Sequence, residues 1–259
     1  MQEIQYHISL KKGDIGPYVI LTGDPGRVPF IAKYFDHAEK VAQNREYVTY
    51  TGTVGGIKIS AVSTGIGCPS TAICIEELSR IGANTFIRVG TAGSLQESVK
   101  YGDLVISTGT VREEGTTRQY IPVNYPAVPD YETLSALVES TKKLGYSYHY
   151  GITHCKDAFY SEINQGLPMD EENSKIWTYW RKSNVLATSM EAAAIFVLAS
   201  LKKLRSGEVL AVIGLTYDEK PVSNILQKDV VVEHAIKTAI EAIKLLHLKD
   251  TKKITKNHN

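Results

Sequence analysis

The order of apolar and polar positions along the chain predicts alternating strands and helices. Short runs rich in β-branched and apolar residues, bounded by glycine, proline or polar clusters, are typical of buried strands. Such runs cover residues 18–22, 57–63, 85–89, 103–108 and 209–213.

Two of the segments outside these runs carry apolar residues at helical spacing. Residues 70–81 place Ile73, Leu78 and Ile81 on a compatible face. Residues 229–248 repeat apolar side chains at Val232, Ile236, Ile240, Ile243 and Leu246. Strands alternating with helices favour a mixed or parallel sheet that is covered by helices, which is an α/β fold.

Length and composition favour one domain. The chain has 259 residues, of which 43% are hydrophobic and 22% charged, enough for one large core. We expect the domain to span residues 1–248 and the polar, lysine-rich segment 249–259 to be a disordered tail. Loops rich in Gly, Pro and Asn at 109–130 and 161–174 are long enough to line a pocket.

The net charge of +1 provides no general field for binding nucleic acid or an anionic membrane. The three cysteines, Cys68, Cys74 and Cys155, are widely spread and lack histidines at zinc spacing, which argues against disulfides and a metal knuckle. No targeting segment or bilayer-spanning apolar run is evident. We therefore expect a cytoplasmic protein with reduced thiols and a small ligand.

A candidate anion site follows the first predicted strand. The loop Gly23-Asp24-Pro25-Gly26-Arg27 lies where an α/β sheet presents backbone donors to an anion. Arg45 and Arg88 occur in similar settings, and Arg88 lies in an apolar run where an arginine needs an anionic partner. Arginine forms paired, charge-assisted hydrogen bonds with phosphate, so these residues predict a phosphate site.

Other nucleotide-binding motifs fit less well. Gly65-Ile66-Gly67 follows a predicted strand, but Ser70 replaces the third glycine of a dinucleotide fingerprint, and the acidic residue for the ribose is missing. A Walker lysine is also absent. Met190-Glu191 opens an apolar helix, where the carboxylate either complements the helix dipole or accepts hydrogen bonds from a ligand diol. His7 either has a structural role or is solvated, or it contacts a ligand.

Several motifs, in this order along the chain, resemble one family. They are His7, residues 23–27, Arg45-Glu46-Tyr47, residues 63–67, Phe86 to Thr91, Tyr125-Pro126-Ala127-Val128, Asp157-Ala158-Phe159-Tyr160 and Met190-Glu191. The chain resembles the hexameric nucleoside phosphorylases up to about residue 248, and most closely their uridine phosphorylase branch. The resemblance implies a three-layer α/β/α domain with a central mixed β-sheet, paired subunits that complete each other's active sites, and three dimers in a hexamer.

The resemblance also implies roles for individual residues. Phosphate would be bound by Gly23, Arg27, Arg88, Thr91 and, from the partner subunit, Arg45. The ribose would meet Met190, Glu191 and the partner's His7. The base would meet Phe159, Gly93, Gln165 and Ile213. Arg88 and Glu191 would be the catalytic residues, with inorganic phosphate as co-substrate and no metal or redox cofactor. Glu46, Ile66 and Ser70 match positions that hold a monovalent cation in some uridine phosphorylases, so K⁺ is a candidate ligand at the dimer interface.

The base end departs from the uridine phosphorylase pattern. The loop 161–168 contains no arginine, so that either Gln165 or Glu162 would have to recognise the base, and Ser189 replaces an acidic residue before the Met-Glu pair. A purine or methylthioadenosine phosphorylase is the alternative, with Asp218 as the nearest carboxylate after the last strand. A nucleoside- or phosphate-binding protein without turnover and a hydrolase of the same fold are further alternatives. Uridine-like nucleosides remain the preferred substrates.

Overall fold

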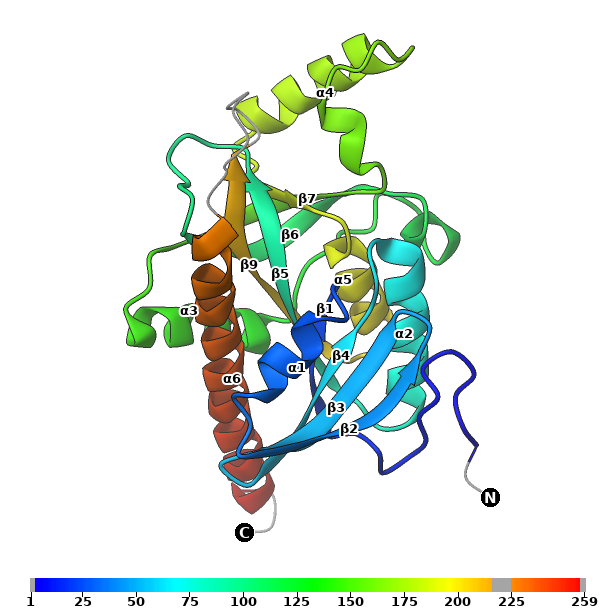
Figure 1. Ribbon diagram of the computed structural model, residues 1–259, viewed down its shortest axis with the longest axis vertical. Helices are drawn as coiled ribbons and strands as arrows, with labels where there is room; N and C mark the ends of the chain where they lie inside the picture. Colours follow the sequence, from blue (N-terminus) through cyan, green and yellow to red (C-terminus); the bar gives the residue numbers. More distant parts are fainter. Residues whose placement is uncertain (1–2, 216–224, 257–259) are drawn as a thin grey trace.

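The computed structural model describes residues 3–215 and 225–256 and has a nine-stranded mixed sheet at its centre (Figure 1). The strands, in chain order, are β1 (Tyr18–Thr22), β2 (His37–Asn44), β3 (Tyr47–Val54), β4 (Ile57–Ser63), β5 (Thr85–Ser94), β6 (Leu104–Glu113), β7 (Tyr148–Lys156), β8 (Ala187–Ser189) and β9 (Arg205–Leu215). Their order in the sheet is β2-β3-β4-β1-β5-β8-β7-β6-β9, and β9 also pairs with β5.

The additional β5–β9 pairing closes part of the sheet on itself. Strands β5, β8, β7, β6 and β9 form a ring in which each strand pairs with the next. β1 is parallel to both β4 and β5, and β9 is parallel to β5, whereas β8 is antiparallel to β5. In this ring Arg88 of β5 lies directly opposite Glu208 of β9.

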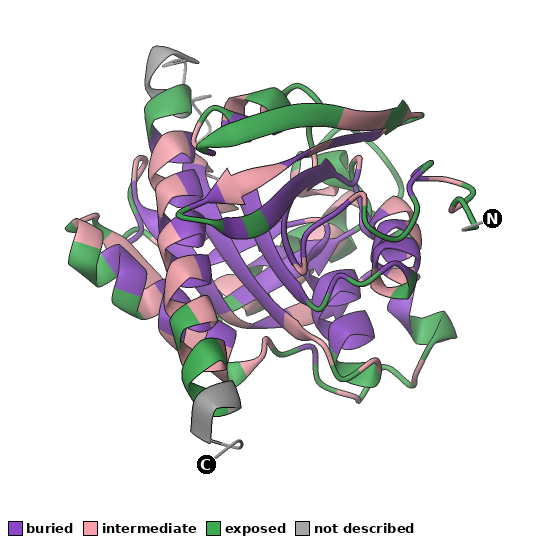
Figure 2. Ribbon diagram, turned by 90° about the horizontal axis from the view of Figure 1, so that it is seen from below, coloured by how far each residue is buried: buried purple, intermediate pink, exposed green. Residues whose placement is uncertain are grey.

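Helices cover both faces of the sheet. The six α-helices in the described part of the chain are α1 (Arg27–Ala32), α2 (Cys68–Arg80), α3 (Tyr131–Leu144), α4 (Asp170–Lys182), α5 (Ala192–Leu201) and α6 (Ile225–Lys256). Apolar residues of α1, α3 and α6 pack into one core cluster, and those of α2 and α5 pack into a second. The central strands between these clusters are buried, whereas β2 is largely exposed at the edge of the sheet (Figure 2).

The predicted α/β class with a mixed sheet is confirmed. Strands β1 and β4 have the predicted limits, while β5, β6 and β9 extend beyond them. The pattern did not predict β2, β3, β7 or β8, nor α1, α3 and α4. Two short 3₁₀ helices, η1 (Thr117–Gln119) and η2 (Phe159–Glu162), lie in or beside the predicted pocket loops.

The polar segment from residue 249, which composition predicts to be a disordered tail, continues α6 as far as Lys256. Asp250 anchors this part of the helix to the sheet: its carboxylate accepts hydrogen bonds from Arg205 (2.8 and 2.7 Å) and from the Tyr18 hydroxyl (2.6 Å). Within the described residues, no helix combines the length and apolar character needed to cross a membrane.

Candidate active site

The loop between β1 and α1 places an arginine close to the centre of the sheet. Gly23 follows β1 directly, and Arg27 is the first residue of α1. Arg27 Nη1 donates to Thr22 Oγ1 (3.1 Å). Burial lowers the pKa of Arg27, and the positive charge of Arg88 lowers it further. Two of the predicted phosphate-binding arginines are therefore close enough to interact electrostatically.

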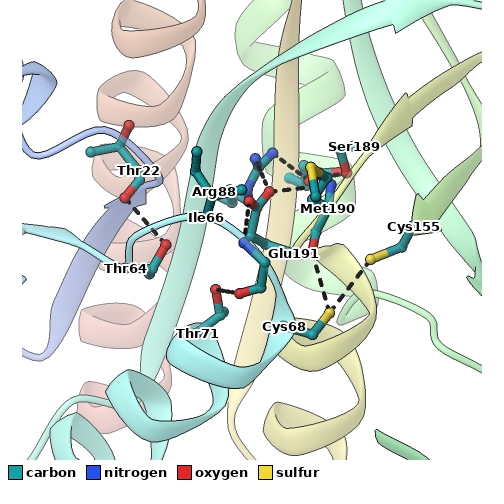
Figure 3. A network of polar contacts seen from close by, with 12 residues as sticks. Thr22, Thr64, Ile66, Cys68, Thr71, Arg88, Cys155, Ser189, Met190 and Glu191 are labelled. Atoms are coloured by element: carbon teal, nitrogen blue, oxygen red, sulfur yellow. Dashed lines mark hydrogen bonds and ion pairs between the residues drawn. The ribbon is translucent and has the colours of Figure 1, made fainter. Parts of the chain in front are cut away.

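Arg88 is buried and lies between two carboxylates. Its Nη1 donates to Glu208 Oε1 (2.8 Å). Its Nη2 forms an ion pair with Glu191 Oε2 (Figure 3). Only 5% of Arg88 is exposed. Burial opposes its charge, but the charges of Glu191 and Glu208 outweigh burial and raise the pKa of Arg88. The anionic partners of Arg88 within the chain are Glu191 and Glu208, and its role in binding phosphate stays a prediction.

Glu191 joins this arginine to a second loop. It occupies the N-cap position of α5, and its Oε1 accepts a hydrogen bond from the backbone N–H of Gly67 (2.9 Å). A Cβ atom added to Gly23 would lie 3.3 Å from the carbonyl oxygen of Gly65 and 3.9 Å from Glu191 Oε1. The loop after β1, the loop after β4 and the start of α5 therefore converge around one carboxylate.

Glu208 is a site residue that the sequence analysis missed. It is fully buried on β9, and Ser107 Oγ donates to its Oε2 (2.5 Å). Ser189 Oγ also reaches Glu208 Oε1 (3.5 Å). Burial raises the pKa of Glu208, while Arg88 acts in the opposite direction. An acidic residue just before the apolar run 209–213 was the available signal, since a buried carboxylate requires a partner.

The other predicted residues at the phosphate and sugar end lie on nearby elements. Thr91 is half-buried on β5, opposite Ala211. Met190 is half-buried between β8 and α5. The sheet thus brings Gly23, Arg27 and Arg88 together with Glu191 within one chain.

The two residues expected to act across a subunit interface lie on the surface or near it. Arg45 is exposed in the turn between β2 and β3, with φ of 52°, a left-handed conformation that is uncommon for residues other than glycine. His7 is half-buried, and its Nδ1 lies 2.6 Å from Glu77 Oε1. Their roles toward a partner subunit stay predictions.

Comparison with known proteins identifies the family. The family model described as the phosphorylase superfamily matches residues 17–247. The chain belongs to the phosphorylase superfamily.

Individual relatives in the superfamily match most of the chain. The chain is 47% identical over 251 residues to uridine phosphorylase of Treponema pallidum, with 96% of each protein covered. It is 44% identical over 210 residues to guanosine phosphorylase of Halorubrum lacusprofundi, covering 81% of this chain and 83% of the relative. The crystal structure of uridine phosphorylase from Vibrio fischeri ES114 has a TM-score of 0.81 at 32% identity, covering 92% of this chain and 95% of the neighbour.

Two of the predicted base-binding residues of this superfamily member lie near the C-terminal ends of strands, and two lie in the segment after β7. Gly93 of β5 pairs with Gly214 of β9, next to Ile213. Phe159 begins η2 and is 56% exposed. Gln165 is exposed, and its amide nitrogen donates to the carbonyl oxygen of Tyr160 (3.1 Å). Asp218, the alternative acid for a purine, lies outside the described residues.

The three predicted cation ligands of this superfamily member cluster around Gly65. The Ser70 hydroxyl lies 3.5 Å from the carbonyl oxygen of Ile66. A Cβ on Gly65 would lie 2.8 Å from Glu46 Cγ and 3.3 Å from Ser70 Oγ, and Gly65 has φ of +72°. The backbone conformation and the close approach of Glu46 therefore both favour glycine at this position.

Proposed function

We propose that the protein is a nucleoside phosphorylase of the uridine phosphorylase type, which uses phosphate to cleave the N-glycosidic bond of a nucleoside. The products are the free base and α-ribose or deoxyribose 1-phosphate, so the enzyme is a pentosyltransferase. The observation that carries the proposal is the Arg88–Glu191 pair beside Arg27 and the glycine loops. Relatives that are named for uridine and guanosine phosphorylase activity support the reaction class.

The charges of this cluster suit the reaction. As the base departs, the sugar gains oxocarbenium character, and a phosphate dianion held next to C1′ both stabilises it and attacks it. Arg27, Arg88 and Thr91 would hold the phosphate, assisted by Gly23 and by Arg45 of a second subunit. Glu191 would accept hydrogen bonds from the ribose diol, with Met190 and a second subunit's His7 completing the sugar site.

The Arg88–Glu191 ion pair would position the phosphate and the sugar next to each other. Without ligands, Arg88 Nη2 and Glu191 Oε2 satisfy each other. A phosphate would bind Arg88 and a sugar diol would bind Glu191, so each ligand would contact one member of the ion pair. Because the backbone N–H of Gly67 holds Glu191 and the Glu208 carboxylate holds Arg88, both side chains would keep their positions during this exchange.

The assembly, location and base are part of the proposal. We infer a homodimer as the active unit, three dimers in a hexamer, a cytoplasmic role in nucleoside salvage, and a K⁺ site at Glu46, Ile66 and Ser70. The chemistry requires no metal or redox cofactor, since phosphate is the nucleophile. Uridine-like nucleosides are the preferred substrates, with Phe159, Gly93 and Ile213 around the base, and purine nucleosides are the alternative.

A substrate panel tests reaction class and base choice together. Uridine, thymidine, inosine, guanosine, adenosine and methylthioadenosine would be incubated with and without inorganic phosphate, and base release and sugar 1-phosphate measured by chromatography. We expect release from uridine only when phosphate is present. Equal release without phosphate would make the protein a hydrolase, and binding without release from any nucleoside would make it a binding protein.

A further inference from the structure

A buried lysine lies beside the predicted base-stacking residue. Lys156 is the last residue of β7 and only 4% exposed. Its Nζ donates to Glu162 Oε1 (2.5 Å) and to the carbonyl oxygen of Phe159 (3.3 Å). The same Nζ lies 5.4 Å from the centre of the Phe159 ring and 4.7 Å from that of Trp177 on α4. Burial lowers the pKa of Lys156, and Glu162 opposes this shift.

Glu162 has one carboxylate oxygen that lacks a partner. Its Oε1 accepts from Lys156, whereas its Oε2 is buried and has no hydrogen-bond partner among the described residues. A buried acceptor without a donor carries an uncompensated desolvation cost, so such atoms are uncommon in folded proteins. An N–H group of a ligand would satisfy this oxygen.

The strand register pairs the end of β7, which carries Lys156, with the end of β8, which precedes Met190 of the proposed sugar site. Cys155 of β7 pairs with Ser189 of β8; Lys156 follows Cys155 in the sequence, and Met190 follows Ser189. His154, two residues before Lys156 and therefore on the same face of the strand, contacts Thr188 Oγ1 through Nδ1 (3.2 Å). Thr188 in turn pairs with Gly93, one of the predicted base-binding residues.

Gln165, the residue first expected to recognise the base, is less suited to that role. It is exposed, and its amide group is bonded to the backbone of its own loop. Lys156 and Glu162 are more buried, lie on either side of Phe159 in the sequence, and provide a charged donor next to a charged acceptor. Hydrogen bonds to charged groups are stronger than those to neutral amides.

We propose that Lys156 and Glu162 recognise the nucleobase: Lys156 Nζ donates to a ring carbonyl oxygen, and Glu162 Oε2 accepts from the adjacent ring N–H. This inference rests on the proposed phosphorylase function and defines its substrate class. Uracil, thymine, hypoxanthine and guanine all present a carbonyl beside an N–H. Cytosine and adenine, placed in the same way, would turn an amino group toward the ammonium and a ring lone pair toward the carboxylate.

The same contact would assist departure of the base. A leaving uracil carries negative charge that is shared with its carbonyl oxygens, and a fixed ammonium beside one of them stabilises that charge as it develops. Lys156 would then affect kcat as well as KM. Glu162 would act mainly on selectivity, because a base that lacks the N–H leaves its Oε2 unpaired.

Two pairs of variants test the proposal. Lys156→Met and Glu162→Gln change the recognition pair, and Lys175→Met and Glu171→Gln change an ion pair on the exposed surface of α4 as matched controls. Phosphate-dependent kcat/KM would be measured with uridine, inosine, cytidine and adenosine. Binding of free uracil would be measured by calorimetry, and stabilisation by inorganic phosphate by thermal unfolding.

We expect Lys156→Met to lower kcat/KM for uridine and inosine by about 10- to 100-fold, with phosphate stabilisation unchanged. We expect Glu162→Gln, which conserves side-chain shape, to reduce the preference for uridine over cytidine by about tenfold. Both should weaken uracil binding, while the control variants match the wild type.

Rates and uracil affinity within twofold of wild type in both recognition variants would overturn the proposal, as would an equal loss for all four nucleosides. An inactive wild type would refute the proposed function instead. Uracil binding by the variants would still be compared in that case, so failure of the proposed function can be distinguished from failure of the base-recognition proposal.

Discussion

Removing Glu208 should show how far the buried charges around Arg88 depend on one another. At the 2.8 Å distance between Arg88 Nη1 and Glu208 Oε1, the Coulomb attraction is about 6 kcal/mol for an effective dielectric constant of about 20. Desolvation of both groups cancels much of this attraction, and removing one partner of a buried pair costs about 3–5 kcal/mol. Because Arg88 keeps Glu191, we expect Glu208→Ala to lower the free energy of unfolding by about 3 kcal/mol, near the lower limit.

A double-mutant cycle separates this interaction from simple loss of packing. Arg88→Ala leaves Glu191 and Glu208 buried without their shared cation and should cost about 3–5 kcal/mol. The double variant Arg88→Ala/Glu208→Ala should cost less than the sum of the single changes by about 1–3 kcal/mol, measured by urea unfolding. Glu208→Gln is the shape-conserving control. Single-variant costs that add to within about 0.5 kcal/mol would refute the coupling.

The same variants separate stability from activity. Arg88→Ala should abolish phosphate-dependent base release, and the double variant should be equally inactive, because the proposed nucleophile has lost its main cation in both. Activity would be measured at a temperature at which circular dichroism shows each variant to be folded. Normal phosphate-dependent turnover in a folded Arg88→Ala protein would contradict the assignment of Arg88 to phosphate.

Two further predictions concern groups outside the phosphate site. Burial and Asp250 raise the pKa of Tyr18 to about 12 from 10.0, so the folded state retains this proton and the free energy of unfolding should fall by up to about 3 kcal/mol from pH 10 to 12. Tyr18→Phe should flatten that decline in urea titrations, and an unchanged slope would contradict it. Burial and Cys68 raise the pKa of Cys155, so iodoacetamide at about pH 8 should alkylate Cys155 in urea and spare it in the folded protein, as read by mass spectrometry. Equal labelling in both states would show that the thiol is accessible.

The strand predictions were accurate for β1 and β4, which are almost fully buried, and failed for β2, which is largely exposed. β1 and β4 were predicted with their limits because their side chains are apolar or small and nearly all buried, which leaves a continuous signal. β2 was missed because most of its residues are exposed and polar, so that its pairing with β3 is the main evidence for a strand. α4 was missed for a similar reason, since Trp177 is its only buried residue.

The segment after residue 248 shows that composition alone does not decide whether a segment is ordered. Residues 249–256 are polar and lysine-rich, which predicted disorder, yet they continue α6. The ion pair between Asp250 and Arg205 and the hydrogen bond from Tyr18 join this helical end to β9 and β1. These contacts link residues 45 and 232 positions apart in the sequence, so no local pattern could have predicted them.

The sequence by itself determined the parts of the proposed phosphate and sugar site, because these parts are local: a glycine loop after a strand, an arginine within an apolar run, and a Met-Glu pair that opens a helix. Only the tertiary structure decided what surrounds these parts. Glu208 reaches Arg88 across 120 positions through the β5–β9 pairing, and the end of β7 that carries Lys156 meets β8 through the pairing of Cys155 with Ser189. A buried charge indicates that a partner must exist, but only strand pairing determines which residue it is.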